Sequence, residues 1–203
     1  MATAEFGNGI HKLRLAMLVY LVGSVLGMVG GFVGLLPGLL SPASVSAAAA
    51  SATVYLIVLI IGLVVGLIAL LLMRSGFKIV RTADTSYGIG VTGTLLEMIG
   101  IILIGVAVAI LIATLGSAAL SGGISGAGGL GGALVGVFAT IGLIVIGAII
   151  AFVGVILTLV GLFRIGSKYK NALVEIGAVL YLFITFVGVI LLYIGLGEIE
   201  RKG

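Results

Sequence analysis

Long apolar stretches alternate with short polar or small-residue segments along this chain. An apolar helix needs about 20 residues to cross a bilayer core of roughly 30 Å. Five stretches meet this length, at residues 15–40, 53–73, 91–115, 131–163 and 172–196. The pattern therefore predicts an all-α integral membrane protein, a bundle of five transmembrane helices forming a single transmembrane domain over residues 1–203.

The segments between the apolar stretches are predicted as tails and loops. Residues 1–10 form a short polar tail, and Gly7-Asn8-Gly9 is typical of a turn. Residues 41–52 and 116–130 are uncharged segments rich in Ser, Ala and Gly. The exact start of the fourth helix is left open, because the whole run would exceed the hydrocarbon thickness unless it tilts, protrudes or begins later.

The stretch from Gly147 to Gly197 is predicted as a transmembrane hairpin with a basic turn at residues 163–170. The four residues Gly76–Ile79 resemble Leu162–Ile165, which suggests an earlier copy of the same hairpin. One organisation that fits is therefore a single leading helix followed by two similar helical hairpins.

Basic residues indicate the orientation, because Lys and Arg accumulate in cytoplasmic loops. Eight of the ten lie before the first span or in the second–third and fourth–fifth loops: Lys12, Arg14, Arg74, Lys78, Arg81, Arg164, Lys168 and Lys170. The segments 41–52 and 116–130 contain none. With five spans, the N-terminus is expected in the cytoplasm and the C-terminus outside; only Arg201 and Lys202 disagree.

Glycines recur at helical spacing within the spans, where small residues let two helices approach closely. The predicted packing positions are Gly23, Gly27, Gly31, Gly62, Gly66, Gly147, Gly154 and Gly161.

Composition supports a location in the cell membrane as a multi-pass protein. Hydrophobic residues make up 62% of the chain and charged residues 8%, against about 25% charged in soluble domains. No basic cluster with interleaved aromatics is present, so nucleic acid is not an expected partner. The expected partners are the lipid bilayer and other membrane subunits or copies of the chain itself.

Few side chains could carry chemistry. Cysteine is absent, and the single histidine, His11, lies beside Lys12 and Arg14 as part of a cationic flank. No catalytic residue, cofactor site or metal site is therefore expected. Glu175 falls in the first turn of the predicted fifth helix, where the helix dipole favours an anion, and is interpreted as an interface residue.

Glu97 lies well inside the predicted third span, and carboxylates within a span usually face the bundle interior or water. Gly93 and Gly100 share its helical face, so another helix could press closely there. Glu97 is either an ion or proton site or a structural carboxylate, protonated or paired with Arg74 or Arg164.

The C-terminal sequence resembles an uncharacterised family of small, glycine-rich multi-spanning membrane proteins from thermophilic archaea. The resemblance lies in Gly166-Ser167-Lys168-Tyr169, in Ile176-Gly177 and in Tyr193-Ile194-Gly195-Leu196. Scarce Asn and absent Gln and Cys also fit a thermophile. The resemblance implies a multi-spanning fold and a source, but no activity and no site residues.

These observations bear on three possible functions. The leading hypothesis is a non-enzymatic membrane protein acting through helix packing, as a self-assembling bundle or as an accessory subunit of a larger complex. The alternative is a small transporter or ion pathway using Glu97, although transporters usually carry several intramembrane polar residues and broken helices. A membrane enzyme is disfavoured, because titratable groups are scarce.

Overall fold

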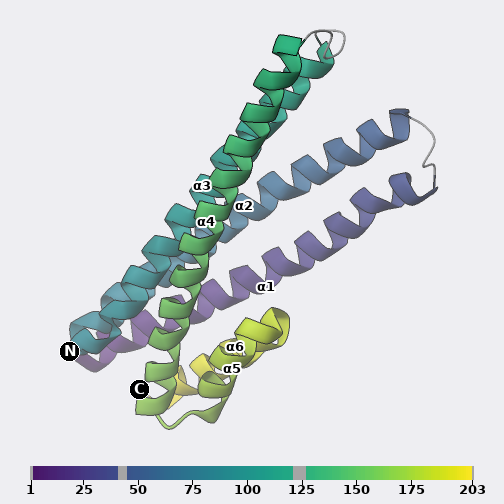
Figure 1. Cartoon of the computed structure of the whole chain (residues 1–203). Coiled ribbons are helices and arrows are strands. Elements are labelled where there is room, and N and C mark those ends of the chain that lie inside the picture. The colour runs from purple at the N-terminus through teal and green to yellow at the C-terminus, as the bar shows by residue number, and fades with distance from the viewer. Residues whose placement is uncertain (1, 41–44, 121–126, 203) are drawn as a thin grey trace. The chain divides into compact units, whose positions relative to one another are not determined.

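The computed structural model describes residues 2–40, 45–120 and 127–202, and the described residues are helical with no strand (Figure 1). The α-helices are α1 (Ala2–Leu40), α2 (Val45–Ala83), α3 (Gly88–Leu120), α4 (Ala127–Lys168), α5 (Ala172–Phe183) and α6 (Thr185–Lys202). A 3₁₀ turn, η1 (Thr85–Tyr87), joins α2 to α3. The all-α prediction is confirmed over the described chain.

Within the described residues, four helices are long and apolar enough to cross a membrane, which is compatible with a membrane protein. The qualifying segments are Glu5–Gly30, Ile60–Ala83, Thr85–Ala113 and Gly136–Lys168. The helices extend beyond the predicted spans, and the expected turn at Gly7-Asn8-Gly9 lies inside α1. Most of the two expected uncharged loops is also helical; their residues 41–44 and 121–126 lie outside the described chain.

The chain forms two compact units. Unit 1 contains Met1–Thr94 and Leu157–Gly203, and unit 2 contains Leu95–Ile156. Unit 1 therefore holds α1, α2, η1, the first turns of α3, the last turns of α4, and both α5 and α6. Unit 2 is the remainder of the α3–α4 pair.

Within unit 1, α1 and α2 lie side by side as a long antiparallel hairpin (Figure 1). Their backbones meet at Gly9 and Gly76, where a Cβ added to Gly76 would lie 2.9 Å from the Gly9 carbonyl oxygen. Leu13, Phe77 and Val80 are fully buried beside this crossing. The lack of side chains at both glycines is therefore what allows the two helices to touch here.

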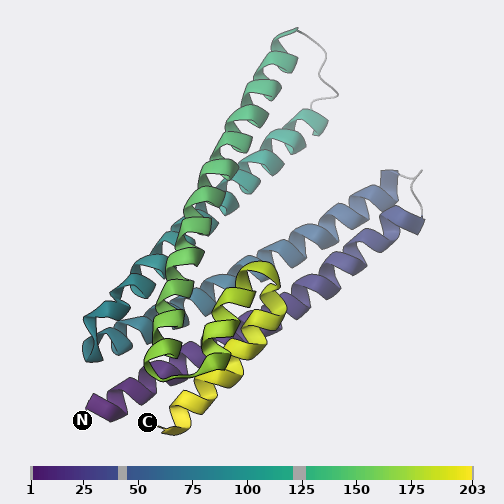
Figure 2. The same cartoon turned by 60° about the horizontal axis from the view of Figure 1, so that its bottom comes forward.

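The predicted fifth span, residues 172–196, is not one helix. The chain breaks at Ile184, whose backbone is non-helical, and α6 folds back against α5 (Figure 2). Phe183, Ile184 and Thr185 are aromatic or β-branched, and such residues have modest helix propensity. This local weakness allows the break, although no Gly or Pro marks it.

Glycines on both arms allow the fold-back. A Cβ on Gly188 would collide with the Tyr181 backbone, and one on Gly195 would lie 2.9 Å from the Val174 nitrogen. Gly177 likewise lies against Leu192. Each contact pairs α5 with α6, so these glycines close a tight helical hairpin.

The two chain ends lie close together in unit 1, and the orientation expected from five spans stays a prediction. The end of α6 lies beside the start of α1 (Figure 2), and Glu200 contacts both His11 and Arg14. The reason is the fold-back at Ile184, which returns the chain to the end from which α5 starts. The helices that open the two expected hairpins also differ in length, because α3 continues to Leu120 whereas α5 stops at Phe183.

Unit 2 is held by a second close backbone contact, between α3 and α4. A Cβ added to Gly100 would lie 2.5 Å from the Gly147 carbonyl oxygen and from the Ala151 nitrogen. Gly147 in turn lies against Ile104 and Leu103. The two helices therefore approach at backbone distance in this unit.

Candidate functional site

Glu97 is buried on α3 in unit 2, with 4% of its surface exposed. It lies three residues before Gly100, at which α4 makes its closest approach. The glycine spacing predicts that another helix can press against this face, and α4 does so at Gly100. Burying a carboxylate in an apolar pair is costly, so Glu97 is the most unusual side chain of unit 2.

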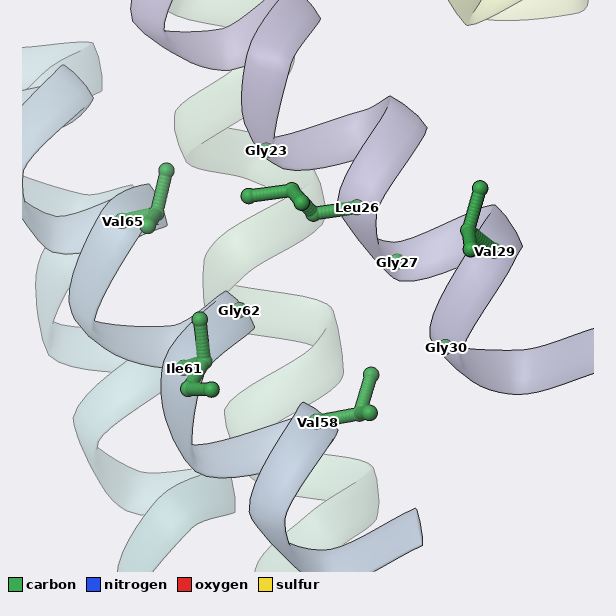
Figure 3. A pocket seen from close by; sticks show the side chains of 9 residues that line it. All are labelled: Gly23, Leu26, Gly27, Val29, Gly30, Val58, Ile61, Gly62 and Val65. Carbon is green, nitrogen blue, oxygen red and sulfur yellow. The ribbon is translucent and has the colours of Figure 1, made fainter. Parts of the chain in front are cut away.

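An apolar groove runs between α1 and α2 in unit 1 (Figure 3). Its volume is about 220 Å³, and its lining residues are Gly23, Leu26, Gly27, Val29, Gly30, Val58, Ile61, Gly62 and Val65. A Cβ on Gly23 would meet Val65 at 2.8 Å, and one on Gly30 would collide with Val58. At Gly27 and Gly62 an added Cβ would meet no described atom within 4 Å.

The other predicted packing glycines differ in their surroundings. Gly161 lies against Gly90, its Cβ position 3.0 Å from the Gly90 Cα, and Gly154 is buried. A Cβ added at Gly66 would meet no described atom within 4 Å. Gly31 lies outside the residues whose surroundings the structure describes.

A cluster of four side chains, here called the terminal cluster, joins α1 to α6: His11, Arg14, Tyr193 and Glu200. Arg14 Nη1 donates to Glu200 Oε2 at 3.1 Å, and His11 Nδ1 lies 2.8 Å from Glu200 Oε1. The Arg14 guanidinium also stands 4.7 Å from the centre of the Tyr193 ring. Burial acts to raise the pKa of Glu200, but the hydrogen bonds from His11 and Arg14 outweigh it, and the pKa lies below its ordinary value.

Asn171 fixes the base of the α5–α6 hairpin. Its side-chain oxygen caps α5 by accepting from the Leu173 and Val174 N–H groups at 3.0 and 3.2 Å. Its side-chain nitrogen donates to the Gly195 carbonyl at 3.2 Å and to Glu198 Oε2 at 3.0 Å. One buried amide thus starts α5 and holds α6 to it.

A shallow polar pocket of about 340 Å³ lies where α2, η1 and α4 meet in unit 1. We call it the basic pocket; it is lined by Asp84, Ser86, Tyr87, Arg164, Ser167 and Lys168. Lys168 Nζ donates to Asp84 Oδ2 at 2.8 Å, and Arg164 Nη1 donates to the Ser86 carbonyl at 3.0 Å. The hydrogen bonds that Asp84 accepts from the Lys168 side chain and the Ser86 N–H hold its pKa well below the ordinary value.

No group of three or more His, Asp or Glu side chains gathers to hold a metal ion in the part of the chain that the structure describes. Glu175 lies on α5, against Gly166 at the end of α4. Sequence reasoning missed the terminal cluster, the Asn171 bridge and the basic pocket. The sequence does contain a signal for the terminal cluster and the Asn171 bridge. Gly177, Gly188 and Gly195 lie in the two halves of one apolar run, and they indicate that these halves can pack closely against each other.

Comparison with known families matches residues 7–202 to the family described as "Protein of unknown function (DUF973)". No curated protein and no solved structure matches the chain.

Proposed function

The chain belongs to this DUF973 family, and we propose that it is a non-enzymatic multi-pass membrane protein that acts by packing its helices against a further apolar transmembrane helix. The observation that carries the proposal is the open groove between α1 and α2. Gly27 and Gly62 face it from opposite walls without filling it (Figure 3). The helix it receives comes from a second copy, as in a self-assembling bundle, or from a larger complex to which the chain is an accessory subunit.

The lining favours a helix as the occupant. Glycines on facing helices leave a flat surface on which a third backbone can come close, and interfaces between membrane helices are enriched in such residues. Exposed Leu26, Val29 and Ile61 surround the glycines and supply the contact area around the flat centre. Helix association in lipid depends on such close packing, because burial of apolar surface supplies no driving force there.

Gly27→Leu and Gly62→Leu test the groove directly. Leucine is the better helix former by up to about 1 kcal/mol, and the space at both positions is open, so folding should be retained. If the groove receives a helix, either substitution weakens association roughly tenfold, or about 1.4 kcal/mol. Association is measured as the mass of the complex in nanodiscs and after mild detergent extraction.

Gly142→Leu is the matched control, because an added Cβ at Gly142 also meets no described atom within 4 Å and the residue is not one of those that line the groove. The proposal would be refuted if Gly27→Leu and Gly62→Leu associate as strongly as Gly142→Leu does. Complexes of the purified chain alone would assign the helix to a second copy, and complexes with a co-purifying protein to another subunit.

The proposed membrane arrangement has four crossings, α1 to α4, and one helical hairpin that enters and returns on the same side. With 12 residues, α5 spans about 18 Å, little more than half the hydrocarbon core, and an apolar stretch of this length is typical of re-entrant segments. The tip carries exposed apolar side chains: Leu182, Phe183, Ile184, Phe186 and Val187. Phe183, 78% exposed, would sit among acyl chains.

The cytoplasm is the proposed location of both chain ends. Arg201 and Lys202 end α6 beside the start of α1, so the two basic residues that opposed the orientation expected from five spans now agree with the other eight. With four crossings and a re-entrant hairpin, all ten Lys and Arg residues fall on one face, as the positive-inside rule favours.

A proton or cation pathway through Glu97 is the second candidate function, favoured by the burial of this carboxylate within α3. The test is proton and cation flux in liposomes. Flux in the wild type that disappears in Glu97→Gln would establish the pathway. Equal flux in both, or none in either, would leave Glu97 a structural carboxylate.

A further inference from the structure

The basic pocket carries an inference that is independent of the helix groove. Two of its lining side chains are cations, Arg164 and Lys168, and one is an anion, Asp84. A third cation lies close by, since the Arg81 Nε is 3.4 Å from the Cβ position of Gly88. The pocket therefore has a net positive charge at the basic end of unit 1.

Asp84 is committed to positioning its neighbours. Its Oδ1 accepts from the Ser86 N–H at 2.9 Å, and its Oδ2 accepts from Lys168 at 2.8 Å. The first contact closes the η1 turn, and the second holds the Lys168 ammonium at the pocket. The carboxylate stays ionised over the ordinary pH range because these contacts lower its pKa, so it offsets one of the two lining cations and leaves the other in excess.

Donors remain available on the pocket side. A guanidinium has five N–H donors in a fixed fork, and Arg164 directs Nη1 to the Ser86 carbonyl, which fixes the orientation of the others. Tyr87 is 1% exposed, its ring centre lies 5.5 Å from the Lys168 ammonium, and its hydroxyl donates a hydrogen bond to no described residue. A buried hydroxyl that donates no hydrogen bond is costly, and an acceptor in the pocket would satisfy it.

We infer that the basic pocket binds the phosphate group of an anionic phospholipid, held by Arg164, Lys168 and the Tyr87 hydroxyl. Arginine and lysine at the ends of membrane helices are the groups that recognise such headgroups. The pocket adjoins apolar surface at the level of the spans, because Phe163, one residue before Arg164, is 43% exposed. A lipid could therefore place its phosphate in the pocket and its chains along α4.

The experiment measures lipid retention by mass spectrometry of the intact protein released from mixed phosphatidylglycerol and phosphatidylcholine nanodiscs. We expect the wild type to retain phosphatidylglycerol preferentially. Arg164→Gln should weaken this retention roughly fivefold, the usual effect of one basic residue near an anionic headgroup. Lys78→Gln is the matched control, because Lys78 is exposed on α2 outside the pocket and loses the same charge.

Arg164→Gln also removes a hydrogen bond to Ser86 and could disturb folding. Ser167→Asp therefore serves as a second variant, because it adds a negative charge at an exposed lining position without removing a side-chain contact that the structure describes. Preferential retention lost in both variants and kept in Lys78→Gln is the expected result. Equal retention of phosphatidylglycerol by all four proteins would refute the proposed lipid site. Thermal stabilisation by inorganic phosphate as large as that by phosphatidylglycerol would overturn the lipid assignment in favour of a free phosphate.

Discussion

Arg14 near the start of α1 and Glu200 near the end of α6 form an ion pair of 3.1 Å across 186 positions of sequence. Because one partner is near each end of the chain, this contact fixes both ends at the same end of unit 1. The rest of the terminal cluster reinforces it: His11 holds the second Glu200 oxygen, and Tyr193 lies against the Arg14 guanidinium. The contact holds the end of α6 against α1 after the fold-back at Ile184.

The ion pair should contribute to holding the hairpin against α1. The side chains of Arg14 and Glu200 are 29% and 26% exposed, so we expect Arg14→Gln to cost about 1 kcal/mol, at the upper end of the range for exposed pairs. The measurement is thermal unfolding in detergent, combined with Glu200→Gln in a double-mutant cycle. Glu5→Gln, at an exposed acidic position of α1, is the control. Additive effects of the two substitutions would contradict a direct interaction.

Acid should weaken the same contact. The folded-state pKa of Glu200 lies below the ordinary 4.5, so its stabilising contribution is present above pH 4.5 and is lost as the pH falls through the lower folded-state value. The unfolding midpoint of the wild type should therefore drop as the pH falls below the ordinary pKa of 4.5, and Glu200→Gln should show a shallower drop. Identical slopes for the two proteins would argue against this role of Glu200.

Asn171 should be among the most sensitive positions of the hairpin. Asn171→Ala removes the cap of α5 and both contacts to α6, and we expect a loss of about 2 kcal/mol. Asn171→Asp keeps the cap acceptor but loses the two donated hydrogen bonds and faces Glu198. Hydrogen exchange of α6 amides separates the roles: both variants should expose α6, whereas only Asn171→Ala should also fray the start of α5. An alanine variant as protected as the wild type would refute the account.

The α3–α4 contact predicts opposite results for two glycine-to-alanine substitutions in unit 2. Gly100→Ala places a methyl group 2.5 Å from the Gly147 carbonyl, which cannot move without shifting the helix. We therefore expect a loss of about 1–3 kcal/mol, as at other overpacked sites. Gly142→Ala meets no described atom within 4 Å and should be neutral or slightly stabilising. Thermal unfolding in detergent measures both, and equal effects would contradict the close approach.

The length of the apolar runs was enough to predict the four long helices. Gly100, on the same helical face as Glu97, indicated that a neighbouring helix can press on that face. Both are local properties of one helix, so the sequence carries them directly. The fourth helix shows the limit even here, because α4 begins at Ala127 inside a segment predicted as a loop.

The break at Ile184 could not be found in the same way. An unbroken apolar run of 25 residues, 172–196, fits a spanning helix as well as a hairpin, and what decides between them is packing against distant residues. Arg14, Tyr193 and Glu200 come together only after the fold-back, as do Asn171 and Gly195. The basic pocket likewise joins residues 84–87 to residues 164–168, and no spacing along the chain announces that pairing.

The most direct test of the proposed arrangement is the accessibility of single cysteines to a membrane-impermeant maleimide in sealed vesicles. The chain has no cysteine of its own, so each introduced cysteine is the only labelling site. Asn8→Cys and Arg201→Cys report the two chain ends, and a cysteine within residues 41–52 reports the opposite face expected from the sequence. We predict that Asn8→Cys and Arg201→Cys react from the same side and the third cysteine from the other. Reaction of Asn8→Cys and Arg201→Cys from opposite sides would restore a fifth crossing and contradict the re-entrant hairpin.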